Sequence, residues 1–187
     1  MDTTNVFKQN LAAFLRPDVR TVVNKGGTRS SKTWSILQLL YLIAVKSKRP
    51  RTISVVSESL PHLKRGCIRD FEDMLKSEDL WDDRNWNATD KIYRVGGSEI
   101  EFIGAETPAK LVGPARDILF VNECINVPFD LYRQAAARTR EKVILDYNPL
   151  YEFWVDAKVL PNDASVLIHS TYRDNDMLTP AQVAEIE

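Results

Sequence analysis

Residues 21–46, TVVNKGGTRSSKTWSILQLLYLIAVK, decide the fold of this chain. The β-branched run at 21–24 predicts a short buried strand, and the nearly unbroken apolar run over 32–46 predicts a buried helix. The turn between them, GGTRSSKT at 26–33, is rich in glycine and small hydroxyl residues. A loop that leads from a strand straight into a helix directs several free backbone N–H groups at one point, so this segment predicts a phosphate-binding site.

The loop matches the phosphate-binding pattern G-x-x-x-x-G-K-[ST] at Gly26, Lys32 and Thr33, with Ser31 in place of the second glycine. Lys32 would place a positive charge on the β- and γ-phosphates, and the Thr33 hydroxyl would ligate Mg²⁺. Serine is small, so we expect the loop to survive the replacement if Ser31 keeps an ordinary, negative φ. The predicted nucleotide-binding residues of the loop are Gly26, Gly27, Thr28, Arg29, Ser30, Ser31, Lys32 and Thr33.

The rest of the chain alternates between strand and helix patterns, which predicts a mainly parallel sheet covered by crossover helices. Further strands are expected at 52–56, 118–121, 142–145 and 166–169, with helices at 61–76 and 129–137. A β-hairpin, 91–95 and 99–103 around Gly96-Gly97, is inserted. We therefore predict a single three-layer α/β domain over 1–187. The chain stops at Glu187 inside an expected helix, TPAQVAEIE, which looks like a cut.

The composition is that of an ordinary globular protein: 44% hydrophobic residues, 27% charged residues and a net charge of -1. This balance excludes a protein that coats nucleic acid over its whole surface, but it allows a local basic stripe. The apolar run at 34–45 is too short to cross a bilayer, and the N-terminus lacks the apolar core of a signal peptide. Two cysteines make no disulfide framework. We expect a soluble intracellular protein, without a membrane partner.

The strand expected at 118–121 ends in Asn122-Glu123. A nucleotide hydrolase needs a carboxylate at such a strand end to hold Mg²⁺ through water, and a base to activate the attacking water. Glu123 is the candidate base. Asn122 occupies the usual aspartate position and is neutral, so it would orient a metal-bound water only through its amide oxygen. Two alternatives stay open: a pair that merely caps the following helix, and a protein that binds nucleotide without turnover.

Polar residues also follow the strand expected at 142–145. Ligands in parallel sheets bind at the carboxyl ends of strands, so Asp146 and Asn148 are candidates to sense the γ-phosphate or the attacking water. Taken alone, Asn148-Pro149 is common turn chemistry.

The ordered set GGTRSSKT (26–33), GPARDILFVNEC (113–124), ILDYNP (144–149) and HSTYRDNDMLTP (169–180) resembles the large subunits of tailed-phage terminases, from about Val6 to the last residue. The resemblance implies a P-loop ATPase of the branch with an additional catalytic glutamate. In that branch the strand before ILDYNP lies between the P-loop strand and the strand before Asn122. It further implies a motor that couples ATP hydrolysis to translocation of double-stranded DNA into the procapsid.

The resemblance also implies roles for single residues. Lys32, Glu123 and Arg29, a basic residue inside the loop, would be catalytic. Thr33 and Asn122, the latter through water, would hold Mg²⁺, and Asp146 and Asn148 would couple hydrolysis to DNA movement. Gln9 in NVFKQNLAAF is the candidate reader of the adenine base. Among Arg133, Arg138 and Arg140, the last two are the main candidates for an arginine finger donated to a neighbouring subunit.

The implied cofactors are ATP and Mg²⁺, and the implied partners are double-stranded viral DNA, the portal protein, the small terminase subunit and further copies of the chain in a ring. The nuclease domain of the family is missing from this sequence, so we expect no DNA cleavage. Two other functions stay open: a nucleotide-binding assembly module with little hydrolysis alone, and a helicase-like ATPase acting on single strands. His62 and His169 have no partner spacing, and we assign them no role.

Overall fold

The structure, a computed structural model, describes residues 3–175 and 178–186. Within these residues the chain forms one sheet of eight strands in the order β3-β4-β5-β2-β6-β7-β1-β8. The strands are β1 (Thr21–Gly26), β2 (Thr52–Ser57), β3 (Trp86–Asn87), β4 (Ile92–Val95), β5 (Ser98–Gly104), β6 (Arg116–Val121), β7 (Thr139–Tyr147) and β8 (Ser165–Ser170). The longer helices are α1 (Asn5–Leu15), α2 (Lys32–Lys46), α3 (Leu60–Arg65), α4 (Cys67–Ser77), α5 (Pro108–Val112), α6 (Phe129–Ala137), the π-helix η3 (Val155–Val159) and α7 (Pro180–Ala184).

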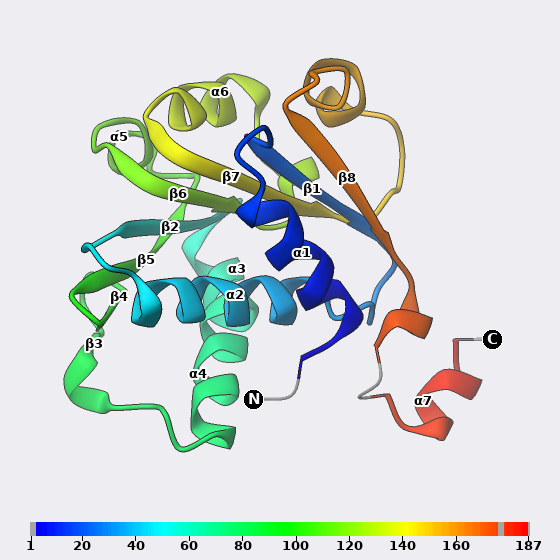
Figure 1. Cartoon of the computed structure of the whole chain (residues 1–187), viewed down its shortest axis with the longest axis horizontal. Coiled ribbons are helices and arrows are strands. Elements are labelled where there is room, and N and C mark those ends of the chain that lie inside the picture. The colour runs from blue at the N-terminus through cyan, green and yellow to red at the C-terminus, as the bar shows by residue number, and fades with distance from the viewer. Residues whose placement is uncertain (1–2, 176–177, 187) are drawn as a thin grey trace.

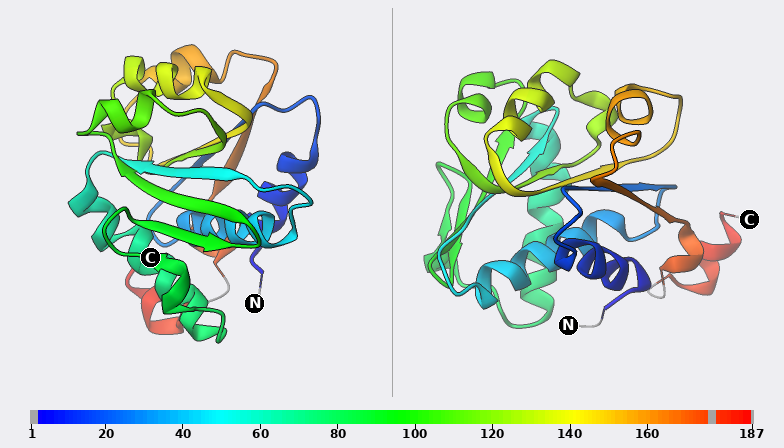
Figure 2. Two further views of the ribbon diagram at one scale, coloured as in Figure 1. Left: turned by 90° about the vertical axis from the view of Figure 1, so that its left-hand side faces the viewer. Right: turned by 45° about the horizontal axis from the view of Figure 1, so that its top comes forward.

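The predicted three-layer α/β architecture is confirmed. Helices α1 to α4 cover one face of the sheet, and α5, α6 and η3 cover the other (Figures 1 and 2). From β5 across to β8 every neighbouring pair is parallel, and only the β3–β4 and β4–β5 pairs are antiparallel. The predicted hairpin is present, with Gly96 and Gly97 at positive φ in its turn. Its second strand pairs in parallel with β2, so the hairpin is part of the main sheet.

The prediction of a single helix at 61–76 is wrong about continuity, because two helices occupy this segment. α3 ends at Arg65 and α4 begins at Cys67, and Gly66 between them has φ -110 and ψ -105. The apolar spacing continues across the break, since Leu63, Cys67 and Phe71 all face the same core. Periodicity alone therefore did not reveal the interruption. The helix expected at the C-terminal end is present as α7, while Glu187 lies outside the described residues.

α1 was not predicted as an element, and it packs beside α2. Thr4 caps its N-terminus by accepting a hydrogen bond from the backbone N–H of Phe7. The buried Asn10 exchanges two side-chain hydrogen bonds with Asn24 of β1, at 2.7 and 2.9 Å. α1 is thereby fixed to the strand that leads into the glycine-rich loop.

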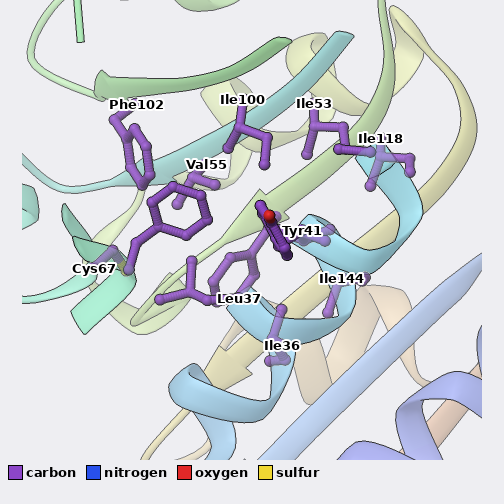
Figure 3. Close-up of a cluster of buried hydrophobic side chains, with 14 of the residues drawn as sticks. Ile36, Leu37, Tyr41, Ile53, Val55, Cys67, Ile100, Phe102, Ile118 and Ile144 are labelled. Carbon is purple, nitrogen blue, oxygen red and sulfur yellow. The ribbon is translucent and has the colours of Figure 1, made fainter. Parts of the chain in front are cut away.

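The core beneath α2 holds the sheet and the loop-bearing helix together. Leu37 and Tyr41 of α2 pack against Ile53 and Val55 of β2 and Ile118 of β6 (Figure 3). Each such side chain stabilises the fold by roughly 1.5–3 kcal/mol when fully buried. The position of the first turn of α2 therefore depends on core packing as much as on local sequence.

We expect Leu37→Ala to lower the free energy of unfolding by about 2–5 kcal/mol, because Leu37 is 1% exposed and its removal leaves a cavity. Leu150→Ala is the matched control, since Leu150 is 77% exposed and should change stability by less than about 0.5 kcal/mol. Urea unfolding followed by tryptophan fluorescence measures both. Equal effects from the two substitutions would contradict this packing.

Candidate active site

Three segments that are far apart in the sequence meet at the carboxyl edge of the sheet. β7 lies between β1 and β6, which confirms the strand order that the resemblance implied. The register pairs Asn24 with Asp146 and Val121 with Leu145, so the residues that follow each strand are adjacent. They line a pocket of about 320 Å³ together with residues of α4 and the C-terminal segment. The lining comprises Gly27, Thr28, Arg29, Ser30, Ser31, Lys32, Thr33, Trp34, Asp70, Glu123, Asp146, Tyr147, Asn148, Asn175, Leu178 and Gln182.

The glycine-rich loop contains two non-glycine residues in the left-handed conformation. Arg29 has φ 63, and Ser31, at the N-terminus of α2, has φ 60 and ψ 12. The condition under which we expected the loop to survive, a negative φ at Ser31, is therefore not met, and the loop accommodates Ser31 in the left-handed conformation. A left-handed residue other than glycine costs about 1–2 kcal/mol. The loop keeps its shape despite this strain because β1 and α2 are both anchored in the core.

The two glycines of the loop have different roles. A Cβ atom on Gly26 would lie 2.2 Å from the carbonyl oxygen of Ser170, because β8 passes directly beside this residue. A Cβ atom on Gly27 would meet nothing within 4 Å. Gly26 is thus required for strand packing as well as for the loop, whereas Gly27 is not required by sterics.

Lys32 is buried and points back into its own loop. Its ammonium donates hydrogen bonds to the carbonyl oxygens of Gly26 and Gly27 at 2.8 and 2.9 Å. It also reaches Ser30 Oγ and Asn148 Oδ1, both at 3.0 Å. Burial lowers the pKa of Lys32, and the nearby Asp146 and Glu123 act in the opposite direction. Asn148 is therefore in direct contact with the loop lysine, and its role in sensing the γ-phosphate stays a prediction.

Asp146 is the most deeply buried acid of the pocket, with 1% of its surface exposed. Its Oδ2 accepts a hydrogen bond from the Thr33 hydroxyl at 2.8 Å, and its Oδ1 accepts one from the Glu123 backbone N–H at 2.7 Å. The Asn122 amide donates to both oxygens, at 3.1 and 3.2 Å. Burial raises the pKa of Asp146, although these hydrogen bonds and Lys32 oppose the effect. Asp146 and Asn148 alternate with the buried Tyr147, so both face the loop.

Glu123 has a partner that the sequence analysis missed. Its Oε2 lies 3.1 Å from Nε2 of His62, and Nδ1 of His62 lies 3.3 Å from Oε1 of Glu58. The assignment of no role to His62 therefore misses this contact. Glu123 itself has φ 48 and ψ 51, a left-handed residue two positions beyond the end of β6. No spacing rule could have identified His62, because it belongs to α3, a helix without a motif that is remote from Glu123 in the sequence.

The C-terminal segment forms one wall of the pocket. Asn175 donates a hydrogen bond to the carbonyl oxygen of Arg29 at 2.8 Å, and Leu178 and Gln182 complete the lining. The Arg29 guanidinium lies 3.5 Å from Glu185, with both side chains largely exposed. Exposed ion pairs of this kind contribute at most about 1 kcal/mol, so this one does not hold Arg29 away from a ligand. Asp176 and Met177 of the motif HSTYRDNDMLTP lie outside the described residues.

Three predicted site residues lie away from the pocket. Gln9 is exposed on the outer side of α1 and is not part of the lining, whereas the inner side of that helix carries Asn10. Arg138 and Arg140 lie at the N-terminal end of β7, roughly 20 Å along the strand from Asp146. Arg138 donates to Gly113 O, and Arg140 lies near Asp117 at 3.4 Å. Both arginines are exposed, and neither lines the pocket of its own chain.

Comparison with known proteins gives a consistent result. A family model described as phage terminase large subunit matches residues 19–187. No curated protein matches the chain. The large terminase of a thermophilic bacteriophage is similar with a TM-score of 0.81 and 18% identity, over 100% of this chain and 50% of that one.

Two further structures share the fold. The large terminase of the same thermophilic bacteriophage in complex with ATP-gamma-S gives a TM-score of 0.78 and 20% identity, over 99% of this chain and 48% of that one. The large terminase of bacteriophage HK97 gives a TM-score of 0.68 and 14% identity, over 89% of this chain and 39% of that one. The chain thus spans about half the length of the large terminase of the thermophilic bacteriophage.

The contrast between the two loop glycines can be tested by alanine substitution. We expect Gly26→Ala to destabilise the protein by about 1–3 kcal/mol, because the added methyl group forces β1 and β8 apart. Gly27→Ala should change the free energy of unfolding by less than about 0.5 kcal/mol. Thermal and urea unfolding measure both variants. A destabilising Gly27→Ala together with a neutral Gly26→Ala would refute the packing of β8 against the loop.

Proposed function

The chain belongs to the phage terminase large subunit family, and from this premise we propose that it is an ATP-hydrolysing motor domain that drives double-stranded DNA into the procapsid. The observation that carries the proposal is the convergence of Lys32, Asp146 and Glu123 on one pocket. Lys32 begins α2, Glu123 lies just beyond β6 and Asp146 lies at the end of β7, and each has the chemistry that phosphoryl transfer to water requires. A fortuitous glycine-rich turn would not bring the other two residues with it.

The loop and α2 supply the binding part of this activity. Backbone N–H groups at the start of α2 would bind the phosphates, and Lys32 would exchange its carbonyl partners for β- and γ-phosphate oxygens. The large terminase of the thermophilic bacteriophage has been solved with ATP-gamma-S and with ADP, and we propose the same class of ligand for this pocket. Trp34, Leu178 and Gln182 line it beyond the loop and are available to contact the rest of the nucleotide.

Glu123 is the general base of the proposed reaction. It lines the pocket beside the loop, and its left-handed backbone turns it away from the core of β6. It would accept a proton from the water that attacks the γ-phosphate. A positioned general base contributes about 10²–10⁴-fold to such a step. Arg29 would add positive charge on the phosphate side once released from Glu185.

The oxygen atoms near Thr33 are of the kind that Mg²⁺ prefers as ligands. A hydroxyl and a carboxylate lie together at the mouth of the loop, and hard oxygen ligands supplemented by phosphate oxygens are what this ion prefers. Bound there, the ion would neutralise negative charge on the β- and γ-phosphates.

Beyond the single chain, we propose that copies assemble in a ring on the portal protein, with the small terminase subunit and double-stranded DNA as further partners, in the host cytoplasm. Arg138 and Arg140 are the candidate arginine fingers, since they are exposed at the opposite edge from the pocket. None of the helices in the described residues is long and apolar enough to span a membrane.

Steady-state ATP hydrolysis with Mg²⁺ tests the catalytic assignment. We expect Glu123→Gln to lower kcat by at least about 10²-fold while ATP still binds, since only the base is lost. Lys32→Ala should abolish binding of a fluorescent ATP analogue. Glu72→Gln, a half-buried residue of α4 that pairs with Lys76 outside the pocket lining, is the matched control and should leave both unchanged.

The outcome also separates the alternatives. Stimulation by double-stranded DNA supports the motor, whereas stimulation by single strands alone would favour a helicase-like ATPase. A wild type that binds ATP but hydrolyses it no faster than Glu123→Gln would leave a nucleotide-binding assembly module.

Mixing of variants tests the arginine finger. We expect Arg138→Ala or Arg140→Ala to lower ATPase activity by about 10³-fold or more, and mixing with Glu123→Gln subunits to restore part of it. Restoration follows because each intact pocket then receives a finger from its neighbour. Arg94→Ala, exposed on the hairpin, is the control. Full activity of both single variants would eliminate these two arginines.

A further inference from the structure

The strand end that normally supplies a metal-holding carboxylate is neutral in this chain, because Asn122 follows β6. The carboxylate nearest to that point comes from the adjacent strand. Val121 pairs with Leu145, so Asn122 and Asp146 lie side by side at the same level of the sheet. Asp146, and not Asn122, receives the hydrogen bond of the Thr33 hydroxyl, at 2.8 Å.

The hydrogen bonds determine which way the Asn122 amide faces. An ionised carboxylate only accepts hydrogen bonds, so the side of the amide that faces Asp146 must be its NH₂ group. The same nitrogen lies 3.3 Å from Thr33 Oγ1. Asn122 therefore presents a donor, and not an oxygen ligand, toward the threonine. A cation next to Thr33 would meet the oxygen of Asp146 first.

We propose that Asp146 provides the acidic oxygen that anchors Mg²⁺ beside Thr33, directly or through one water, while Asn122 acts as a positioning residue that orients Asp146. In this arrangement the carboxylate that holds the metal ion belongs to β7, whereas the usual position for it is the end of β6. The arrangement keeps one negative charge at the site and leaves Asn148, bonded to Lys32, to respond to the γ-phosphate. This inference rests on the proposed function, because it requires a site that binds a metal–nucleotide complex.

Binding of Mn²⁺, observed by electron paramagnetic resonance in the presence of saturating ADP, tests the assignment without an activity measurement. We expect Asp146→Asn to weaken Mn²⁺ binding by about 10–100-fold, the range found when a group that supports a metal ion is removed. Asp73→Asn is the matched control, since it removes the same charge from an exposed position on α4 outside the pocket lining. It should change Mn²⁺ affinity by less than about threefold, because solvent and salt screen exposed charges. Affinity for ADP without metal should be equal in all three proteins.

A second variant covers the case in which Asp146→Asn does not fold. Asn122→Asp combined with Asp146→Asn keeps one carboxylate and one amide in the buried pair, so the number of donors and acceptors is unchanged. We expect it to fold and to regain Mn²⁺ affinity to within about tenfold of wild type, because the acid has returned to the neighbouring strand end.

The outcomes are distinct. Folded Asp146→Asn protein with wild-type Mn²⁺ affinity, or a folded exchange variant that does not bind Mn²⁺, would overturn the inference while leaving nucleotide binding intact. A wild type that binds neither ADP nor Mn²⁺–ADP would overturn the proposed function and the inference with it.

Discussion

Much of the pocket depends on one buried carboxylate. An unpaired charge at the depth of Asp146 would cost several kcal/mol, so the surrounding groups have to compensate it. They do so with three donors from two different segments: the Thr33 hydroxyl from α2, and the Asn122 amide and the Glu123 backbone N–H after β6. Together these hydrogen bonds tie both segments to the end of β7. The loop helix and the segment with the proposed base are therefore held in register by a single side chain of the strand between them.

Local sequence was sufficient wherever one segment determines its own structure. α2 begins and ends at the predicted residues, because an apolar run bounded by a glycine-rich loop and a basic turn leaves little choice. The strand ends, and with them Lys32, Glu123 and Asp146, were also placed correctly at one edge, since parallel strands all end on the same side. The bounds of α2 follow from the apolar pattern, and the shared edge follows from the common direction of the parallel strands.

Features that arise between segments were not predictable in the same way. The left-handed φ of Ser31 results from the path between two anchored elements, and the partner of Glu123 comes from a helix that has no motif. Gly66 interrupts a helix whose apolar spacing continues unbroken, so the interruption leaves no trace in the periodicity. Gln9 was expected at the pocket, but the helix turns Asn10 inward and leaves Gln9 outside. In each case the conformation depends on contacts between segments that are distant in the sequence. Local sequence patterns do not reveal these contacts.

The position of Lys32 has a consequence for the release of an anion from the site. In the activity that we propose, the product has to leave, and a buried lysine left without partners would oppose that release by about 3–5 kcal/mol. Here the loop supplies two carbonyl oxygens and a hydroxyl as acceptors for the ammonium, and Asn148 adds an amide oxygen. When phosphate or ADP departs, the ammonium has partners to return to, and no bare charge is left behind. The partners of Lys32 close to the loop thus lower the free-energy cost of leaving this site without an anion.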